Sequence, residues 1–554
     1  MKLLDWLVLA ATLCSIIGYG LYRSRGANTV NRYLLAGKTM PWYAMALSIM
    51  ATQASAITFI STTGQSYVDG MRFVQFYFGL PIAMVVISAT VVPRFHNAGV
   101  YTAYEYLEKR FDAKTRAIAS VVFLLQRGFS VGLALYAPAI VLAVIFGWPD
   151  RITTLLMGVV VICYTVVGGV QAIAWTDVQQ MMVIFAGLFI ALAMIIAQLP
   201  PDVGLTDAVY LAGAMGKLNT VDFTFDLNNR YTVWSGLLGG TFLFLSYFGC
   251  DQSQVQRYLT GKSIAQSKLS LLFNAIAKIP MQFFILFVGA MVFVFYTFEK
   301  PPLLFQKAVL EKVNSPEIHA RFDRAFEERK AAAKGLVAAH QSSDAGARAA
   351  NLERYRGAQS DLDGARKQAG AASGEKDFND TNYIFLSFVT RYLPAGLVGL
   401  IIAVIFAAAM STIAAEVNSL ATVSVIDIYK RHVKPGAEDR HYLLASRAAT
   451  AFWGLYAVFF AQYGKNLGSL IEAVNMLGSL FYGSLLGVFT LAFFVPRVKG
   501  TGAFVGMIAG EAAIFAAFKF TSISFLWYNV IGCVVVILTG LAVQAAVRPA
   551  SAAR

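Results

Sequence analysis

The chain has 554 residues, of which 57% are hydrophobic and 14% are charged, and its mean hydropathy is +0.61. A soluble protein of this length needs a much larger charged surface, so the composition excludes a soluble globular protein and indicates a membrane protein. The formal net charge is +14, but the basic residues are dispersed over several segments, which excludes the single basic stripe that a nucleic acid would need.

Thirteen apolar stretches are long enough to be membrane-spanning helices, since a span needs about 20 apolar residues. In chain order they are 4–22, 41–67, 73–93, 117–147, 152–170, 177–199, 231–256, 268–297, 383–427, 442–462, 467–495, 501–519 and 524–546. We interpret the first as a retained span rather than a cleaved signal peptide, because it carries Asp5 early and no cleavage site follows it. The predicted fold class is an all-α membrane protein with about 13 transmembrane helices.

The distribution of basic residues predicts the orientation. With the N-terminus outside, the segments predicted to be cytoplasmic hold 21 Lys or Arg, whereas the N-terminus and the short outer loops hold six. An excess of Lys and Arg marks the cytoplasmic side of a membrane protein. The predicted cytoplasmic segments are 23–38, 94–116, 257–268, 430–447, 497–499 and the tail from 548. We therefore expect a multi-pass protein of the plasma or inner membrane, with its C-terminus in the cytoplasm.

Residues 299–380 differ from the rest, since they hold 14 Lys or Arg and 13 Asp or Glu. The stretch 319–340 is rich in helix formers, whereas 341–350 and 367–376 are predicted to be looser. The topology places this insert outside, where we expect a small helical extracellular or periplasmic element. Two roles stay open for it, a solvated spacer and a cap over an entrance.

Three candidate spans carry unusual polarity. The stretch 48–67 holds eleven Ser, Thr, Gln or Tyr residues, and 241–257 and 406–429 are also polar. Polar groups at membrane depth must face a cavity or another helix. Packing between helices explains one such group, but three polar spans together favour a transport pathway. The second and seventh spans stand where the first helices of two inverted five-helix repeats would be broken.

A cation site is predicted where these spans meet. Ser411 and Thr412 are adjacent, and Ala408 lies one helical turn earlier. Carbonyl groups of a broken helix, for example those of Ala51 and Ala54, could complete a set of five oxygen ligands. Oxygen ligands without a carboxylate suit a weakly held monovalent cation. The alternative is that the two hydroxyls bond to their own helix backbone.

Four motifs resemble the sodium/solute symporter family, which includes sodium–sugar, proline, monocarboxylate, iodide and vitamin carriers. They are ATQASAITFI (51–60), GGVQAIAWTDVQQ (168–180), DQSQVQRYLTGKS (251–263) and AMSTIAAEVNSLATVSVIDIY (409–429). The resemblance covers nearly the whole chain except the insert. It implies the leucine-transporter fold, a five-plus-five inverted repeat, with one extra N-terminal helix and with sodium as the coupling ion.

The resemblance also implies a division of the chain. It consists of an extra helix and cytoplasmic loop (1–40), a first five-helix repeat (41–200), the start of a second repeat (201–298), the insert (299–380), the rest of the second repeat (381–495) and C-terminal helices with a cytoplasmic tail (496–554).

Carried over to this sequence, the family's sodium ligands are Ala51, Ala54, Ala408, Ser411 and Thr412. Asp177, in the WTD part of the second motif, resembles an acidic residue on the sodium exit path. A solvated helix cap is the alternative for this residue.

The substrate residues implied by the resemblance begin with Tyr247 and Lys278. Tyr247 aligns with an aromatic residue that closes the inner side of the sugar site, although a tyrosine within a membrane span is more often packing. Lys278 aligns with a sugar-binding lysine, and an ion pair with Asp251 is its alternative. Gln53 and Asn475 are further polar candidates for the pocket.

Three positions depart from the sugar carriers. Thr58, Tyr77 and Phe244 stand where those carriers place glutamine, glutamate and asparagine. A polyol is held through many hydrogen bonds, so these losses favour a small organic anion near Lys278. Arg127 and Glu416 lie within spans and are not expected to face lipid, so each is an internal pair or a pathway residue.

The leading hypothesis is a secondary active transporter that imports a small solute with sodium by alternating access. The solute is an organic anion or another small metabolite, with a sodium–sugar symporter as the alternative. A transporter-like sensor that acts with a separate signalling partner is a hypothesis of another class. An enzyme is not expected, because the sequence has no nucleophile elbow, His-Glu-x-x-His motif or phosphate loop. The expected partners are the solute, sodium and the lipid bilayer, without nucleic acid, and with a monomer as the transport unit.

Overall fold

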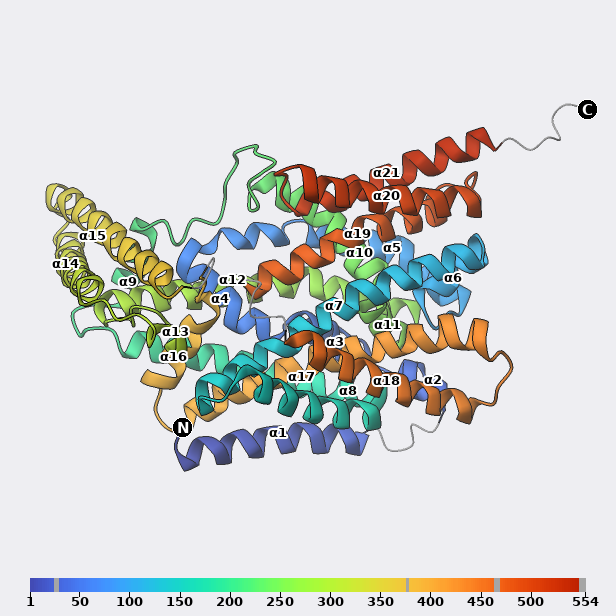
Figure 1. Ribbon diagram of the computed structural model, residues 1–554, viewed down its shortest axis with the longest axis horizontal. Helices are drawn as coiled ribbons and strands as arrows, with labels where there is room; N and C mark the ends of the chain where they lie inside the picture. Colours follow the sequence, from blue (N-terminus) through green and yellow to red (C-terminus); the bar gives the residue numbers. More distant parts are fainter. Residues whose placement is uncertain (24–28, 375–377, 463–468, 548–554) are drawn as a thin grey trace, which may run out of the picture.

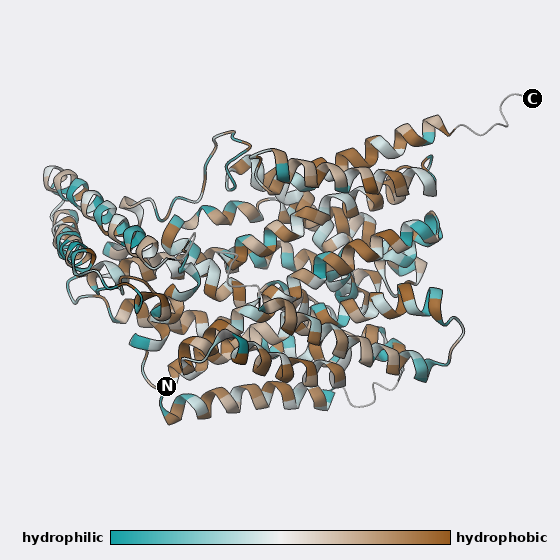
Figure 2. Ribbon diagram, viewed as in Figure 1, coloured by the Kyte–Doolittle hydropathy of each residue, from teal (hydrophilic) through white to brown (hydrophobic). Residues whose placement is uncertain are grey.

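The computed structural model describes residues 1–23, 29–374, 378–462 and 469–547. Within these ranges the regular elements are all helical, and long helices lie side by side in one bundle (Figure 1). Ten of them are long and apolar enough to cross a membrane, or eleven if one bent pair counts as a span. Apolar residues dominate the bundle, as Figure 2 shows, so the predicted all-α membrane class is confirmed. The predicted tail from 548 lies outside the described residues.

The first helix, α1 (Leu3–Arg23), lies along the outside of the bundle against α17 (Leu397–Val423). Its Asp5 is buried, and the carboxylate accepts hydrogen bonds from the backbone N–H groups of Gly396 (2.6 Å) and Gly399 (3.2 Å). The first N–H groups of a helix have no partner within the helix, and a carboxylate satisfies them well. An acidic residue near the start of a span is therefore accommodated by the neighbouring helix.

Two spans are broken, as their polarity predicted. Helices α3 (Trp42–Gln53) and α4 (Ala56–Asp69) meet at a bend of 56°. Helix α10 (Gly240–Gly249) stops at Cys250, and α11 (Gln252–Leu259) restarts with the Asp251 carboxylate accepting from the N–H of Ser253 (2.9 Å). These breaks expose backbone groups inside the bundle, where they can bind ions or solutes.

The remaining elements are these: α2 (Val30–Leu35), η1 (Ala36–Lys38), η2 (Met71–Tyr77), α5 (Leu80–Ala98), α6 (Ala103–Arg110), α7 (Ala113–Phe146), α8 (Asp150–Ala197), α9 (Leu205–Ala214), η3 (Ser235–Gly239), α12 (Ile264–Phe298), α13 (Lys307–Leu310), α14 (Pro316–Gln341), α15 (Ala345–Ala372), η4 (Thr381–Tyr383), α16 (Ile384–Tyr392), η5 (Ser424–Val433), α18 (Asp439–Ala461), α19 (Leu470–Phe494), α20 (Gly500–Phe520) and α21 (Leu526–Ala546).

The structure corrects one predicted span. Residues 383–427 are not one helix, because α16 ends at Tyr392 and α17 begins at Leu397. Pro394 and Gly396 lie between them, and Gly396 has a φ of 92°, which favours glycine. The span therefore starts at Leu397. The predicted spans 152–170 and 177–199 both lie within α8, whose two parts meet at a kink at Gly169 (φ 59°, ψ −170°).

The insert forms a helical hairpin at one end of the bundle (Figure 1). Helices α14 and α15 enclose a small core of their own, which includes Phe322, Phe326 and Leu362. The Tyr355 and Thr297 hydroxyls lie 2.9 Å apart and join α15 to α12. The looser structure expected for 341–350 and 367–376 is wrong for the parts within α15, because packing against α14 stabilises a helix there.

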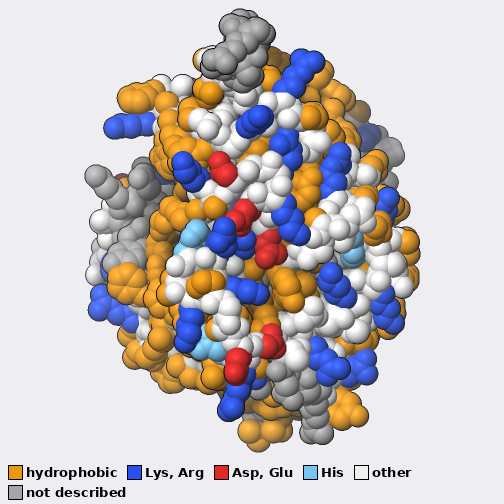
Figure 3. All heavy atoms as spheres, turned by 90° about the vertical axis from the view of Figure 1, so that its right-hand side faces the viewer, with side chains coloured by type: hydrophobic (Ala, Val, Ile, Leu, Met, Phe, Trp, Pro, Cys, Tyr) orange, Lys and Arg blue, Asp and Glu red, His pale blue; other side chains and the backbone are white. Residues whose placement is uncertain are grey.

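The two ends of the bundle differ in charge and in the chain terminus that they hold. The N-terminus lies at the end that carries the insert, whereas α21 runs to the opposite end (Figure 1). That opposite end is seen face-on in Figure 3, where Lys and Arg side chains are more numerous than Asp and Glu. The N-terminus and the end of α21 therefore lie at opposite ends of the bundle.

Candidate functional site

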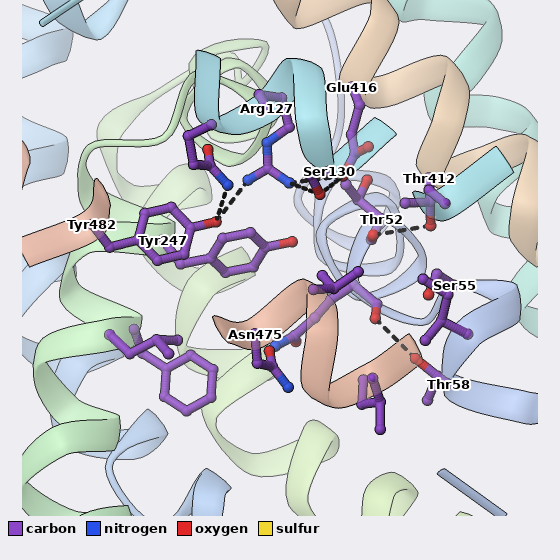
Figure 4. A pocket seen from close by; sticks show the side chains of 18 of the residues that line it. Thr52, Ser55, Thr58, Arg127, Ser130, Tyr247, Thr412, Glu416, Asn475 and Tyr482 are labelled. Carbon is purple, nitrogen blue, oxygen red and sulfur yellow. Dashed lines mark hydrogen bonds and ion pairs between the residues drawn. The ribbon is translucent and has the colours of Figure 1, made fainter. Parts of the chain in front are cut away.

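A cavity of about 80 Å³ lies in the middle of the bundle, next to the break between α3 and α4 (Figure 4). Side chains from α4, α7, α10, α17 and α19 face it together with the end of α3. The residues that line it are Thr52, Gln53, Ser55, Ile57, Thr58, Phe76, Tyr77, Gln126, Arg127, Ser130, Ala134, Leu243, Phe244, Tyr247, Thr412, Glu416, Ile471, Val474, Asn475 and Tyr482. All the predicted substrate residues except Lys278 are among them.

The predicted sodium ligands lie on two facing segments beside this cavity. Thr412 Oγ1, on α17, donates a hydrogen bond to the carbonyl of Thr52 (3.1 Å), one residue after Ala51. All five predicted ligands are buried, and Ala54 has left helical geometry, with φ −89° and ψ 66°. Thr412 thus holds α17 against the end of α3, where the helix breaks. Hydroxyl and backbone carbonyl oxygens are the kind of ligand that hard cations prefer.

Asp177 contacts Ser411, one member of the hydroxyl pair. Its carboxylate accepts hydrogen bonds from Ser411 Oγ (2.5 Å) and from Ser48 Oγ (2.5 Å), and the residue has no exposed surface. The interpretation of Asp177 as a solvated helix cap is therefore wrong. Its carboxylate instead joins α8 to both α3 and α17.

Arg127 forms the charged centre of the cavity wall. Its guanidinium donates to Glu416 Oε1 (2.7 Å) and to the Tyr482 hydroxyl (2.8 Å), and it also pairs with Asp251. Arg127 and Glu416 are only 3% and 4% exposed, and Asp251 is fully buried. Figure 4 shows Arg127 between Tyr482 and Glu416 at the edge of the cavity. The sequence signalled these charges by their depth within spans, but it did not indicate that three spans bring them together.

Lys278 lies apart from this network. It is fully buried on α12, its Nζ has no hydrogen-bond partner within the described residues, and it lies 5.9 Å from the centroid of the Tyr77 ring. Asp251 pairs with Arg127, so the alternative ion pair between Lys278 and Asp251 is wrong. Tyr77 lines the cavity, whereas Lys278 does not.

Aromatic rings make up much of the remaining wall. Tyr77 and Phe244 are stacked, with ring centroids 5.6 Å apart, and Phe76 packs against both of them. Tyr247 packs against Tyr482 across 6.0 Å, and its hydroxyl accepts a hydrogen bond from Gln254 on α11 (2.7 Å). The predicted tyrosine thus connects the two halves of the second broken helix.

The polar side chains of the cavity are partly unsatisfied. Thr58 Oγ1 donates to the carbonyl of Gln53 (3.3 Å). The side-chain Oε1 of Gln53 and of Gln126, together with Nδ2 of Asn475, have no partner within the described part of the chain. Buried polar groups are normally hydrogen-bonded, so these atoms are available to a bound solute or to water.

Comparisons with known proteins agree with this geometry. The profile of the sodium:solute symporter family matches residues 33–319 and 364–510. The sodium-dependent multivitamin transporter of Oryctolagus cuniculus is 27% identical over 514 residues, which are 92% of this chain and 69% of that protein. The sodium/sialic acid symporter NanT of Aliivibrio fischeri is 27% identical over 543 residues, which are 97% and 92% of the two chains.

A solved structure of a Na⁺-coupled sialic acid symporter in a substrate-bound, outward-open state has the same fold. Its TM-score is 0.78 at 25% sequence identity, and the match covers 99% of each chain. The chain therefore has the leucine-transporter-like fold that the family resemblance implied. The chain belongs to the sodium:solute symporter family, and it is a sodium-coupled symporter of small solutes rather than an enzyme.

Proposed function

We propose that the central cavity binds the solute and that sodium binds beside it, between Ala51, Ala54, Ala408, Ser411 and Thr412. The observation that carries this proposal is the hydrogen bond from Thr412 Oγ1 to the carbonyl of Thr52, since it brings α17 onto the helix break. Thr412 and Thr52 both line the cavity. A cation held by α17 and α3 would therefore set the position of the cavity wall.

The coupling follows from this shared wall. Sodium bound between α17 and the end of α3 favours the arrangement in which Gln53 and Thr58 face the solute. When sodium leaves, the two segments lose their common ligand and the solute loses affinity. One charge that crosses 100 mV contributes about 2.3 kcal/mol, which drives accumulation of a neutral solute. Asp177, which already contacts Ser411, is proposed to guide sodium along its exit path.

The proposal includes the topology and the organisation of the chain. We propose 13 spans in the plasma or inner membrane, with the N-terminus outside, the C-terminus in the cytoplasm and a monomer as the transport unit. The opposite positions of the N-terminus and α21 and the basic face of Figure 3 support this orientation. Two apolar helices shorter than the main ones, Arg151–Cys163 and Ser235–Gly249, would complete the count.

The six segments implied by the family resemblance are kept in this proposal, with the insert 299–380 on the outer side. Arg329 of the insert is fully buried and donates to the carbonyl of Tyr296 at the end of α12 (2.5 Å), and Gln341 donates to Asp207 on α9 (3.0 Å). These contacts favour a rigid outer cap over a solvated spacer.

Uptake into proteoliposomes tests the sodium site. A screen of sugars, amino acids and carboxylates, by thermal shift with and without sodium, first supplies a transported solute. Ser411→Ala combined with Thr412→Ala should abolish sodium-dependent uptake, because two of the five ligands are lost. Ser419→Ala is the matched control, since Ser419 is a hydroxyl on α17 that bonds to its own helix at the carbonyl of Glu416 (2.7 Å). Uptake that ignores sodium, or that survives the double substitution, contradicts the proposal.

A further inference from the structure

One oxygen of the Glu416 carboxylate is unused. Oε1 accepts hydrogen bonds from Arg127 (2.7 Å) and from Ser130 (3.3 Å), whereas Oε2 has no partner within the described residues. The residue is only 4% exposed, yet it lines the central cavity. A buried carboxylate oxygen without a donor is costly, so a group that enters the cavity and donates to it is favoured.

The charges around Glu416 do not balance. Arg127 is one cation between two carboxylates, those of Asp251 and Glu416. The carboxylate of Asp251 has further hydrogen-bond donors, because it accepts from Ser253 Oγ (2.7 Å) and from the Tyr482 hydroxyl (3.2 Å). The cluster therefore carries one formal negative charge in excess. Within it, the carboxylate oxygen without a hydrogen-bond partner in the described chain is Oε2 of Glu416. Charges at membrane depth require a partner.

The cavity offers little to an anion. Among the described residues that line it, Arg127 is the one cationic side chain, and both of its terminal nitrogens are already engaged by carboxylates and hydroxyls. Lys278 is a second cation, but it lies outside the lining. A solute carboxylate that engages the terminal nitrogens would have to displace Glu416 or Asp251 from Arg127, since Nε is the one guanidinium nitrogen without a partner in the described chain. That exchange would leave a buried carboxylate without its cation, which is strongly unfavourable.

The aromatic wall suits a cation. Five aromatic rings line the same cavity: Phe76, Tyr77, Phe244, Tyr247 and Tyr482. The faces of such rings attract a positively charged nitrogen, and aromatic enclosures are a common way to bind ammonium groups. The rings and the free carboxylate oxygen are independent features of one cavity, and both favour the same kind of ligand group.

We propose that Glu416 determines the substrate class of the cavity by accepting a positively charged nitrogen of the solute, in an amine or a quaternary ammonium group. This inference rests on the proposed function, because it assumes that the central cavity is the solute site. It differs from the organic-anion expectation, which depended on Lys278. A zwitterion satisfies it as well, provided that its nitrogen faces Glu416.

Matched pairs of probes test the charge alone. The pairs are glycine betaine with 3,3-dimethylbutanoate, choline with 3,3-dimethylbutan-1-ol, and L-proline with cyclopentanecarboxylate. Each pair has nearly the same shape, but only its first member carries a charged nitrogen. The measurement is the thermal shift of the purified full-length protein in sodium, followed by titration of the affinity. We expect at least one charged member to stabilise the protein while its carbon counterpart does not.

Two variants separate the role of Glu416 from a general effect. Glu416→Gln should weaken binding of the charged member about 30-fold or more, because a charged partner in a buried site is lost. Glu511→Gln is the matched control. Glu511 accepts from Ser484 (2.5 Å), also has one oxygen without a partner in the described chain, and does not line the cavity. It should bind the probes as the unaltered protein does. A sodium-dependent thermal shift in both variants shows that they are folded.

The inference is overturned if the carbon counterparts bind as well as the charged members, or if Glu416→Gln keeps its affinity. It is also overturned if sodium shifts the melting temperature and no charged member does so, since another sodium ion or a proton would then neutralise Glu416. Failure of the proposed function would give a different experimental result. In that case sodium itself gives no shift, or Ser411→Ala with Thr412→Ala leaves the sodium shift intact.

Discussion

Ser411 Oγ donates a hydrogen bond of 2.5 Å to Oδ1 of Asp177, and the other carboxylate oxygen of Asp177 accepts one from Ser48. Ser411 belongs to α17, Ser48 to α3 and Asp177 to α8, so one carboxylate joins three helices. Two of these helices carry the proposed sodium ligands. The negative charge of Asp177 therefore acts on the sodium site at short range and without intervening solvent.

Asp177→Asn should lower the apparent sodium affinity about tenfold, which corresponds to about 1.4 kcal/mol. The substitution keeps the size of the side chain and removes the charge that favours a nearby cation. The measurement is the sodium concentration that gives half-maximal uptake or thermal shift. Ser48→Ala is the control, because it removes one hydrogen bond and keeps the charge. An unchanged sodium dependence in Asp177→Asn would show that this carboxylate plays no part in cation binding.

Arg127 is expected to be the most sensitive charged position in the bundle. Arg127→Gln leaves the carboxylates of Asp251 and Glu416 buried without their cation, so it should destabilise the protein by about 3–5 kcal/mol. The melting temperature in detergent reports this loss.

A combined variant separates the charge of Arg127 from its packing. Arg127→Gln with Asp251→Asn and Glu416→Gln removes all three charges, so it should recover most of the lost stability. If the triple variant is as unstable as Arg127→Gln alone, the loss comes from packing and not from unpaired carboxylates.

The helices of the bundle could be predicted from the sequence where a local pattern of hydropathy or polarity indicates them. Hydropathy alone predicted most of the spans, and the polar residues of 48–67 predicted the break between α3 and α4. The span 383–427 was wrong because apolar composition does not reveal that Pro394 and Gly396 interrupt the helix. The two ends of helix α15 were expected to be looser, because their stability comes from packing against α14 and not from their own Gly- and Ser-containing sequence.

The sequence did not predict which residues the buried charges pair with. Arg127, Asp251 and Glu416 come from three spans, and Arg127 and Glu416 are 289 positions apart. Which charge faces which depends on the rotation of each helix within the bundle. That is why Lys278 was given Asp251 as an alternative partner, whereas the structure gives Asp251 to Arg127. Resemblance to a family indicates candidate ligand positions, but it does not predict such specific pairs.

Lys278→Met should raise the stability of the protein. The Lys278 Nζ is buried without a hydrogen-bond partner in the described chain, and burial of an unsatisfied polar group costs about 1–3 kcal/mol in proteins. Methionine keeps the length of the side chain and removes the polar atom. The melting temperature without solute measures the gain. A lower melting temperature in Lys278→Met would mean that Nζ has a partner, such as a bound water or ion.

The interactions of Glu108 predict a pH-dependent contribution to stability at the basic end of the bundle. This residue lies on α6, outside the spans, and its carboxylate pairs with Arg116 (2.7 Å) and Arg431 (2.7 Å). Burial raises the pKa of Glu108, but hydrogen bonds and charges from Arg431 and Arg116 outweigh burial, so the pKa lies below its ordinary value of 4.5. A lowered pKa in the folded state stabilises the protein above the unfolded value, and this stabilisation is lost as the pH falls.

Glu108→Gln should therefore lower the melting temperature at neutral pH, by an amount that corresponds to about 1 kcal/mol or less, because the pair is partly exposed to solvent. The difference from the unaltered protein should shrink as the pH falls below about 4.5, where the unfolded chain already binds the proton. Glu353→Gln, at an exposed position on α15 without an ion pair in the described chain, is the control and should show no such trend. A Glu108→Gln difference that stays constant from neutral to acid pH would mean that the glutamate acts through its shape and hydrogen bonds, and that its charge contributes nothing to holding α6 against α7 and η5.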